Sequence, residues 1–177
     1  GNTWQPINNG LTATKVSALA VDPVTSTIVY AGTDKGVFRS TDGGEVWRRV
    51  ERGLPAGDMG KIGLAVTPAD PERVYATIEA GDEERGFYRS LDRGESWERR
   101  NPYVSGGTGP HYYQEIYASP QDPDLVYQMD VFVQVTRDGG ATFDNLGTGG
   151  EAHSDNHAWW IDPADGGPRE APIPVAN

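Results

Sequence analysis

Residues 40–47 of the chain read STDGGEVW, and two later stretches repeat the pattern, SLDRGESW at 90–97 and TRDGGATF at 136–143. Each has a hydroxyl residue, Asp two positions later, Gly two positions after that and an aromatic residue at its end. We call these stretches boxes 1, 2 and 3. A partial fourth copy opens the chain, where Trp4 matches the Trp that ends box 1. Self-similarity at a spacing of 50 and then 46 residues predicts an array of like structural units.

A matching segment precedes each box: AVDPVTSTIVYAGT, AVTPADPERVYATI and ASPQDPDLVYQMD. Each contains an apolar strand, a turn with Asp-Pro, and a second strand with Val-Tyr. The apolar strands, at 16–21, 62–66 and 116–118, carry apolar side chains on both faces, which predicts burial between two layers. A third strand leads into each box and a fourth leaves it. Four short strands in about 40 to 50 residues are typical of one blade of a β-propeller.

We therefore predict an all-β fold, a β-propeller segment of four-stranded antiparallel blades. The end of a preceding blade, three full blades and a partial blade are expected at 1–10, 11–52, 53–102, 103–148 and 149–177. The partial blade starts with a strand and then departs from the repeat, because its prolines remove backbone donors.

Closure of the array is expected because open sheet faces and edges invite aggregation. Two routes remain open at this point. A strand at 4–7 joins a strand at 157–161 in one composite blade, or two chains complete a ring as a homo-oligomer.

Composition excludes several classes of protein. Lys and Arg number 15 against 26 Asp and Glu, and a net charge of −11 argues against a nucleic-acid partner, which requires a basic face. With 23 Gly and 13 Pro the chain is not a helical bundle, and with 5 Trp, 8 Tyr and 4 Phe it is not a disordered acidic tail. The absence of cysteine excludes disulfides and thiolate chemistry. No apolar stretch approaches ~18 residues, so no membrane partner is expected.

The boxes are explained by turn chemistry. The hydroxyl and the carboxylate can bind backbone groups across a hairpin, the glycine permits a positive φ, and the aromatic ring enters an apolar layer. These aspartates are poor choices for catalytic acids. The residues given this structural role are Ser40, Asp42, Gly44, Trp47, Ser90, Asp92, Gly94, Trp97, Thr136, Asp138, Gly140 and Phe143.

The pattern S/T-x-D-x-G-x-x-W/F resembles the Asp-box, or bacterial neuraminidase repeat, family over roughly residues 1–165. The resemblance implies a β-propeller, as in sialidases, xyloglucan-degrading glycosidases, sortilin-like receptors and photosystem assembly factors. The wording HSDNHAWWIDPAD is most similar to the glycosyl-hydrolase-like and sortilin-like branch, which implies a secreted or periplasmic location. Membership of such a fold does not transfer an activity.

One polar cluster stands just before the expected strand at 157–161. If the segment is extended, His153, Asp155 and His157 share one face, and Asn156 stands among them. Two imidazoles and a carboxylate at this spacing can bind a divalent metal or hold a sugar. The alternative is that they bind loops together near the mouth of the channel. No other cofactor is expected.

A second candidate is a glycine-rich stretch that leads into His111, Tyr112 and Tyr113. Glycines beside aromatic rings suit carbohydrate recognition. The alternative is a long connection whose tyrosines pack against the next blade. The glycines are not a phosphate-binding loop, because no Lys-Ser/Thr follows them.

Glycoside hydrolysis requires two carboxyl groups about 5 to 9 Å apart. The catalytic candidates outside the boxes are Glu115, Asp130 and Asp155, and Asp34 is a weaker candidate. Sialidase chemistry is not favoured, because the arginines stand beside the boxes and in fourth strands. Nucleophilic hydrolase chemistry is not favoured either, because G-x-S-x-G is absent.

Two functional hypotheses follow. The first is a binding or scaffold module for a carbohydrate or protein ligand, not catalytic as an isolated chain. The second is part of a glycoside-hydrolase-like enzyme that uses carboxylates facing the channel.

Overall fold

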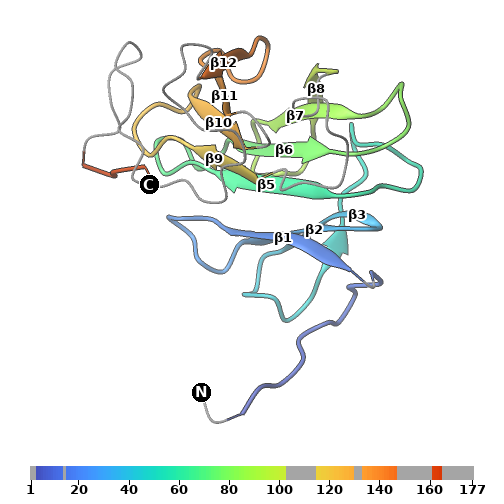
Figure 1. Cartoon of the computed structure of the whole chain (residues 1–177). Coiled ribbons are helices and arrows are strands. Elements are labelled where there is room, and N and C mark those ends of the chain that lie inside the picture. The colour runs from blue at the N-terminus through green and yellow to red at the C-terminus, as the bar shows by residue number, and fades with distance from the viewer. Residues whose placement is uncertain (1–2, 14, 103–114, 130–132, 147–160, 165–177) are drawn as a thin grey trace.

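Three antiparallel sheets of four strands each make up the computed structural model of the chain, which describes residues 3–13, 15–102, 115–129, 133–146 and 161–164 (Figure 1). The first sheet is formed by β1 (Val16–Val21), β2 (Val29–Thr33), β3 (Gly36–Ser40) and β4 (Arg48–Arg49). The second is formed by β5 (Ile62–Val66), β6 (Val74–Ile78), β7 (Gly86–Ser90) and β8 (Glu98–Asn101). The third is formed by β9 (Glu115–Ala118), β10 (Val126–Met129), β11 (Val133–Thr136) and β12 (Asp144–Leu146). The predicted all-β fold is confirmed.

In every sheet the strands follow one another in chain order. The turn between the first two strands is built by the side chain that directly follows the first strand. In the first sheet, the Asp22 carboxylate accepts the N–H groups of Val24 and Thr25 at 2.9 and 2.8 Å. In the third, the Ser119 hydroxyl accepts the N–H groups of Gln121 and Asp122. Such Asx- and Ser-type turns fix the register of a hairpin locally.

The second sheet lies between the other two, with β5 in contact with both β1 and β9 (Figure 1). One apolar cluster joins the first and second sheets through Tyr30, Val37, Ile62 and Trp97. Another joins the second and third sheets through Tyr75, Phe87 and Ile116. The repeated layers therefore form one continuous stack of side chains.

Burial of the first strands differs from the prediction. The β5 residues are mostly buried, as expected, but β1 exposes Val16, Leu19 and Val21 at 48%, 66% and 52%. The prediction of burial is therefore wrong for β1. The physical reason is that β5 has the first sheet on one face, whereas no sheet covers the corresponding face of β1 in the described part of the chain.

Two short segments hydrogen-bond to the Trp of the box that follows them in the chain. The N–H of Trp47 donates to the carbonyl of Asn9 at 2.8 Å, and the N–H of Trp97 donates to the carbonyl of Arg52 at 3.0 Å. The next residues, Gly10 and Gly53, have φ of 82° and 79°. We call 7–11 and 50–54 the clamps. The second clamp follows β4 and therefore ties the first sheet to the box of the second sheet.

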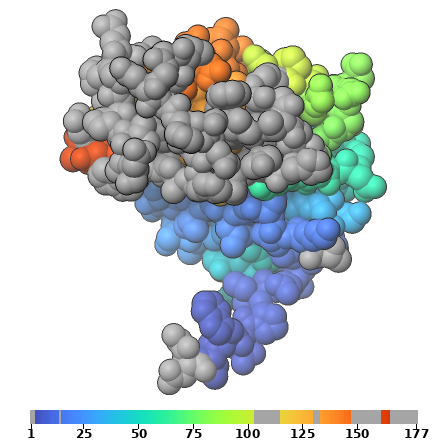
Figure 2. Space-filling model, viewed as in Figure 1, coloured from blue at the N-terminus to red at the C-terminus, as the bar shows by residue number. Residues whose placement is uncertain are grey.

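The N-terminal segment projects from the stack of sheets (Figure 2). Trp4 is 90% exposed, and 4–7 form no strand, so the expected strand at this position is not present in the structure. At the other side of the stack, Ile161 packs against the third sheet. The rest of the expected strand at 157–161 lies outside the described residues.

Candidate binding site at the inner strands

The three boxes share one set of hydrogen bonds. The box hydroxyl donates to the aspartate at 2.6, 2.7 and 2.8 Å in boxes 1, 2 and 3. The same hydroxyl accepts the N–H of the box glycine at 2.9, 2.8 and 2.8 Å. The aspartate accepts an N–H from the residue before the aromatic at 2.9, 2.8 and 2.9 Å. The hydroxyl and at least one oxygen of the aspartate in each box are therefore engaged by the hairpin itself.

These bonds stabilise the ionised aspartates. The hydrogen bond from Ser40 is the largest influence on Asp42 and lowers the pKa of that carboxyl. Partial burial opposes the effect at Asp138, but hydrogen bonds from the Thr142 side chain and backbone outweigh it and lower its pKa to about 2. A carboxyl that stays ionised and hydrogen-bonded is not a proton donor near neutral pH.

Buried tyrosines connect neighbouring sheets. The Tyr30 hydroxyl donates to the carbonyl of Arg93 at 2.9 Å, and the Tyr75 hydroxyl donates to that of Pro123 at 2.6 Å. Burial raises the pKa of both tyrosines, so the hydroxyls remain protonated donors. These contacts have a structural role.

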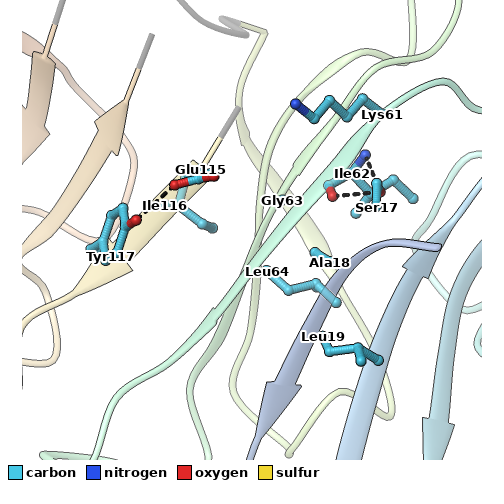
Figure 3. Close-up of a pocket in the computed structure, with 10 residues that line it drawn as sticks. All are labelled: Ser17, Ala18, Leu19, Lys61, Ile62, Gly63, Leu64, Glu115, Ile116 and Tyr117. Atoms are coloured by element: carbon cyan, nitrogen blue, oxygen red, sulfur yellow. Dashed lines mark hydrogen bonds between the residues drawn. The ribbon is translucent and has the colours of Figure 1, made fainter. Parts of the chain in front are cut away.

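The candidate site is a hollow of about 260 Å³ at the first strands of the three sheets, β1, β5 and β9, which we call the inner strands (Figure 3). Each inner strand is an edge strand of its sheet. The residues that line the hollow are Ser17, Ala18, Leu19, Lys61, Ile62, Gly63, Leu64, Glu115, Ile116 and Tyr117. The lining therefore mixes apolar side chains with the polar groups of Ser17, Lys61, Glu115 and Tyr117, which can orient a ligand.

Two groups of opposite charge lie at the hollow. Glu115 opens β9, is exposed, and accepts a hydrogen bond from the Tyr117 hydroxyl at 2.7 Å (Figure 3). Lys61 stands directly before β5, on the other side. A ligand between them meets a carboxylate from one sheet and an ammonium group from the next.

Ser17 fixes the spacing between two inner strands. Its hydroxyl donates to the carbonyl of Ile62 at 2.8 Å and accepts the N–H of Ile62 at 3.1 Å (Figure 3). This pair of bonds replaces a direct backbone bridge between β1 and β5. The shape of the hollow is thus set by a contact between residues 45 positions apart.

Of the predicted catalytic residues, the structure places Glu115 at the hollow. Asp34 lies after β2, where it accepts the N–H of Lys15 at 3.1 Å, and does not line the hollow. The other predicted catalytic and binding residues lie outside the described residues: Asp130, Asp155, His111, Tyr112, Tyr113, His153, Asn156 and His157.

Sequence reasoning missed Ser17, Lys61 and Tyr117. A signal was available, because all three lie in or directly before predicted first strands, and first strands line the channel of a propeller. Within the described ranges, no group of three or more metal-binding side chains occurs, and the predicted metal ligands His153, Asp155 and His157 lie outside them. The described strands and loops also include no helix that could span a membrane.

No protein-family model and no curated protein sequence matches the chain. Solved structures do. An ancestral GH74 enzyme matches with a TM-score of 0.59 and 21% identity, over 76% of this chain and 19% of the enzyme. The GH74 xyloglucanase from Xanthomonas campestris matches with a TM-score of 0.54 and 20% identity, over 78% and 24% of the two chains. YCF48 bound to D1 peptide matches with a TM-score of 0.57 and 14% identity, over 76% and 40%.

The fold and these likenesses define the class: the chain is a β-propeller segment built of four-stranded antiparallel blades. It spans about a fifth to a quarter of the length of the GH74 enzymes it resembles. At this level of identity the likeness concerns the fold, and function has to be argued from the site.

Proposed function

We propose that the chain is a binding module, and that its ligand is an extended polypeptide held at the hollow of the inner strands. The observation that carries the proposal is the hollow itself, with Glu115 on one side and Lys61 on the other. We also propose that boxes 1, 2 and 3 are Asp-boxes, with structural duties only.

Three properties favour a polypeptide. The inner strands are sheet edges, so they offer backbone groups that take no part in a ladder of their own sheet. The opposite charges of Glu115 and Lys61 suit a ligand polypeptide that carries both basic and acidic side chains. Leu19 lines the hollow and is 66% exposed, so it offers apolar contact. Among the solved structures similar in fold, YCF48 has a peptide bound.

A carbohydrate is the other ligand class. The predicted binding residues His111, Tyr112, Tyr113, His153, Asn156 and His157 are proposed to extend the site. Aromatic rings among them would favour a sugar.

An array of peptides and glycans separates the two ligand classes. The full chain is applied as wild type, as Glu115→Gln, and as the control Glu45→Gln, in which the same change is made at an exposed position in box 1. Binding of charged peptides that is lost in Glu115→Gln and kept in Glu45→Gln is expected. Binding confined to glycans, or to no member of the array, would overturn the peptide proposal.

The alternative function is a part of a glycoside hydrolase. GH74 enzymes are among the similar solved structures, and Glu115 is a carboxylate at the hollow. Catalysis would require a second carboxyl group, for which Asp130 and Asp155 are the candidates. Hydrolysis of xyloglucan oligomers by the wild type and not by Glu115→Gln would replace the binding proposal with this one.

A further inference from the structure

A lysine stands directly before the inner strand of each of the first two sheets. Lys15 precedes β1 and Lys61 precedes β5. The N–H of Lys15 donates to Asp34 Oδ1 at 3.1 Å, and the N–H of Lys61 donates to Glu79 Oε2 at 2.9 Å. Each acidic residue directly follows the second strand of the same sheet, and its own N–H donates back to the carbonyl of the lysine, at 3.2 and 3.1 Å. The two lysines therefore hold the same place in neighbouring repeats.

A β-bulge connects these two places. Ser17 is the extra residue of β1 in its pairing with β2, and such bulges bend a strand and re-aim its side chains. The Ser17 hydroxyl binds both the N–H and the carbonyl of Ile62, the residue after Lys61. Ser17 itself stands two positions after Lys15. The two lysines therefore stand at adjoining strand ends, and Lys61 lines the hollow. We call Lys15 and Lys61 the lysine pair.

The charge of Lys15 stands apart from the ion pairs of the fold. Lys35, the remaining lysine of the chain, pairs with Asp58 at 3.4 Å. Arg39 and Arg89 pair with glutamates at 2.6 and 2.5 Å. Lys15 is exposed, and within the described ranges its ammonium group has no ion-pair partner. This charge is therefore available to a ligand.

The acidic neighbours of the lysine pair serve its backbone. Asp34 and Glu79 each engage one carboxylate oxygen with the N–H of a lysine. Gly60 makes room for this contact in the second sheet, because a Cβ there would lie 2.2 Å from Glu79 Oε2. The acids thus fix where each lysine leaves its strand, while the side chain of Lys15 stays exposed.

We infer that the lysine pair is an anion subsite at the rim of the hollow, and that it binds the carboxylate of an acidic residue in the ligand polypeptide. The inference rests on the proposed function and deepens it, because it assigns the two charges of the ligand to two places. An acidic residue of the ligand lies where the first and second sheets adjoin, and a basic residue lies at Glu115 of the third sheet. Flexible ammonium groups suit this contact, since they attract a carboxylate without a fixed bidentate geometry.

Calorimetric titration of the full chain tests the subsite. The probes are extended peptides with one Glu and one Arg at varied separations, and each has a partner peptide with Gln in place of Glu. At low salt the wild type should bind the best Glu peptide about fivefold more tightly than its Gln partner. Lys15→Met should reduce this ratio to about twofold, because one of the two ammonium groups is lost.

Arg48→Met is the matched control. It removes one positive charge from β4, at the opposite edge of the same sheet, where the Arg48 side chain is 66% exposed, and it should leave the ratio at about fivefold. The far-UV circular dichroism spectra of both variants should match that of the wild type.

The outcomes separate the subsite from the proposed function. An unchanged ratio in Lys15→Met, with binding still weakened in Glu115→Gln, would overturn the subsite and leave the proposed function standing. An equal fall of the ratio in Arg48→Met would also overturn the subsite, because the effect would then belong to net charge. Binding of none of the peptides by the wild type would overturn both.

Discussion

The glycines of the clamps show how one residue controls the joint between blades. A Cβ at Gly53 would lie 1.8 Å from the carbonyl oxygen of Trp97, whereas a Cβ at Gly43 in box 1 would meet nothing within 4 Å. Both glycines have φ near 80°. The two positions therefore separate backbone strain from steric conflict.

Gly43→Ala should lower the free energy of unfolding by about 1 to 2 kcal/mol, the cost of a left-handed conformation for a residue with a Cβ. Gly53→Ala should cost at least about 3 kcal/mol, because the strand end must also move and the Arg52–Trp97 hydrogen bond weakens. Urea denaturation followed by tryptophan fluorescence measures both. Equal losses of unfolding free energy in the two variants would contradict the steric role of Gly53 in the second clamp.

The box aspartates predict a dependence of stability on acidity. The pKa of Asp138 is lowered to about 2 from 3.8. A lowered pKa stabilises the fold fully above the unfolded-state pKa, and the stabilisation is lost as pH falls through the folded-state value. The difference in unfolding free energy between the wild type and Asp138→Asn should therefore shrink between about pH 4 and about pH 2. A difference that stays constant over that range would contradict this role.

At the scale of elements, one hydroxyl ties the second sheet to the third. Thr67 is fully buried; its hydroxyl donates to the carbonyl of Ser119 at 2.5 Å and accepts the N–H of Ala69 at 3.1 Å. Thr67→Val keeps the shape and leaves both partners unsatisfied, so it should cost about 1 to 3 kcal/mol.

Thr67→Ser is the control for this contact. It keeps the hydroxyl and removes one methyl group, for a loss of about 1 kcal/mol. Thermal and urea unfolding of the two variants give the comparison. If Thr67→Val is as stable as Thr67→Ser, the hydrogen bond between the sheets does not stabilise the stack.

Elements could be predicted from the sequence where their causes are local. Apolar runs predict the strands around 16–21 and 62–66. The Asp22 turn follows from hydrogen bonds to the residues two and three positions later. The hollow could not be predicted in the same way. It depends on the contact of Ser17 with Ile62, which are distant in sequence. The exposure of Leu19 was missed because burial depends on a neighbouring sheet, not on the strand itself.

At the scale of the whole molecule, the charge of −11 has a different meaning from the one the composition suggests. Part of it belongs to box and turn aspartates that bind their own backbone, such as Asp42 and Asp22. Such groups already serve the fold, so the net charge alone is weak evidence for a basic partner. The charges that bear on a ligand are those at the hollow, Glu115 and Lys61.

The central claim is that the hollow of the inner strands binds a ligand through Glu115. Calorimetric titration with the strongest peptide from the array tests it most directly. Glu115→Gln should weaken binding by about tenfold, the loss expected for one charge-assisted hydrogen bond of about 1.4 kcal/mol, while the control Glu45→Gln should leave the Kd unchanged. An unchanged Kd in Glu115→Gln would contradict the claim.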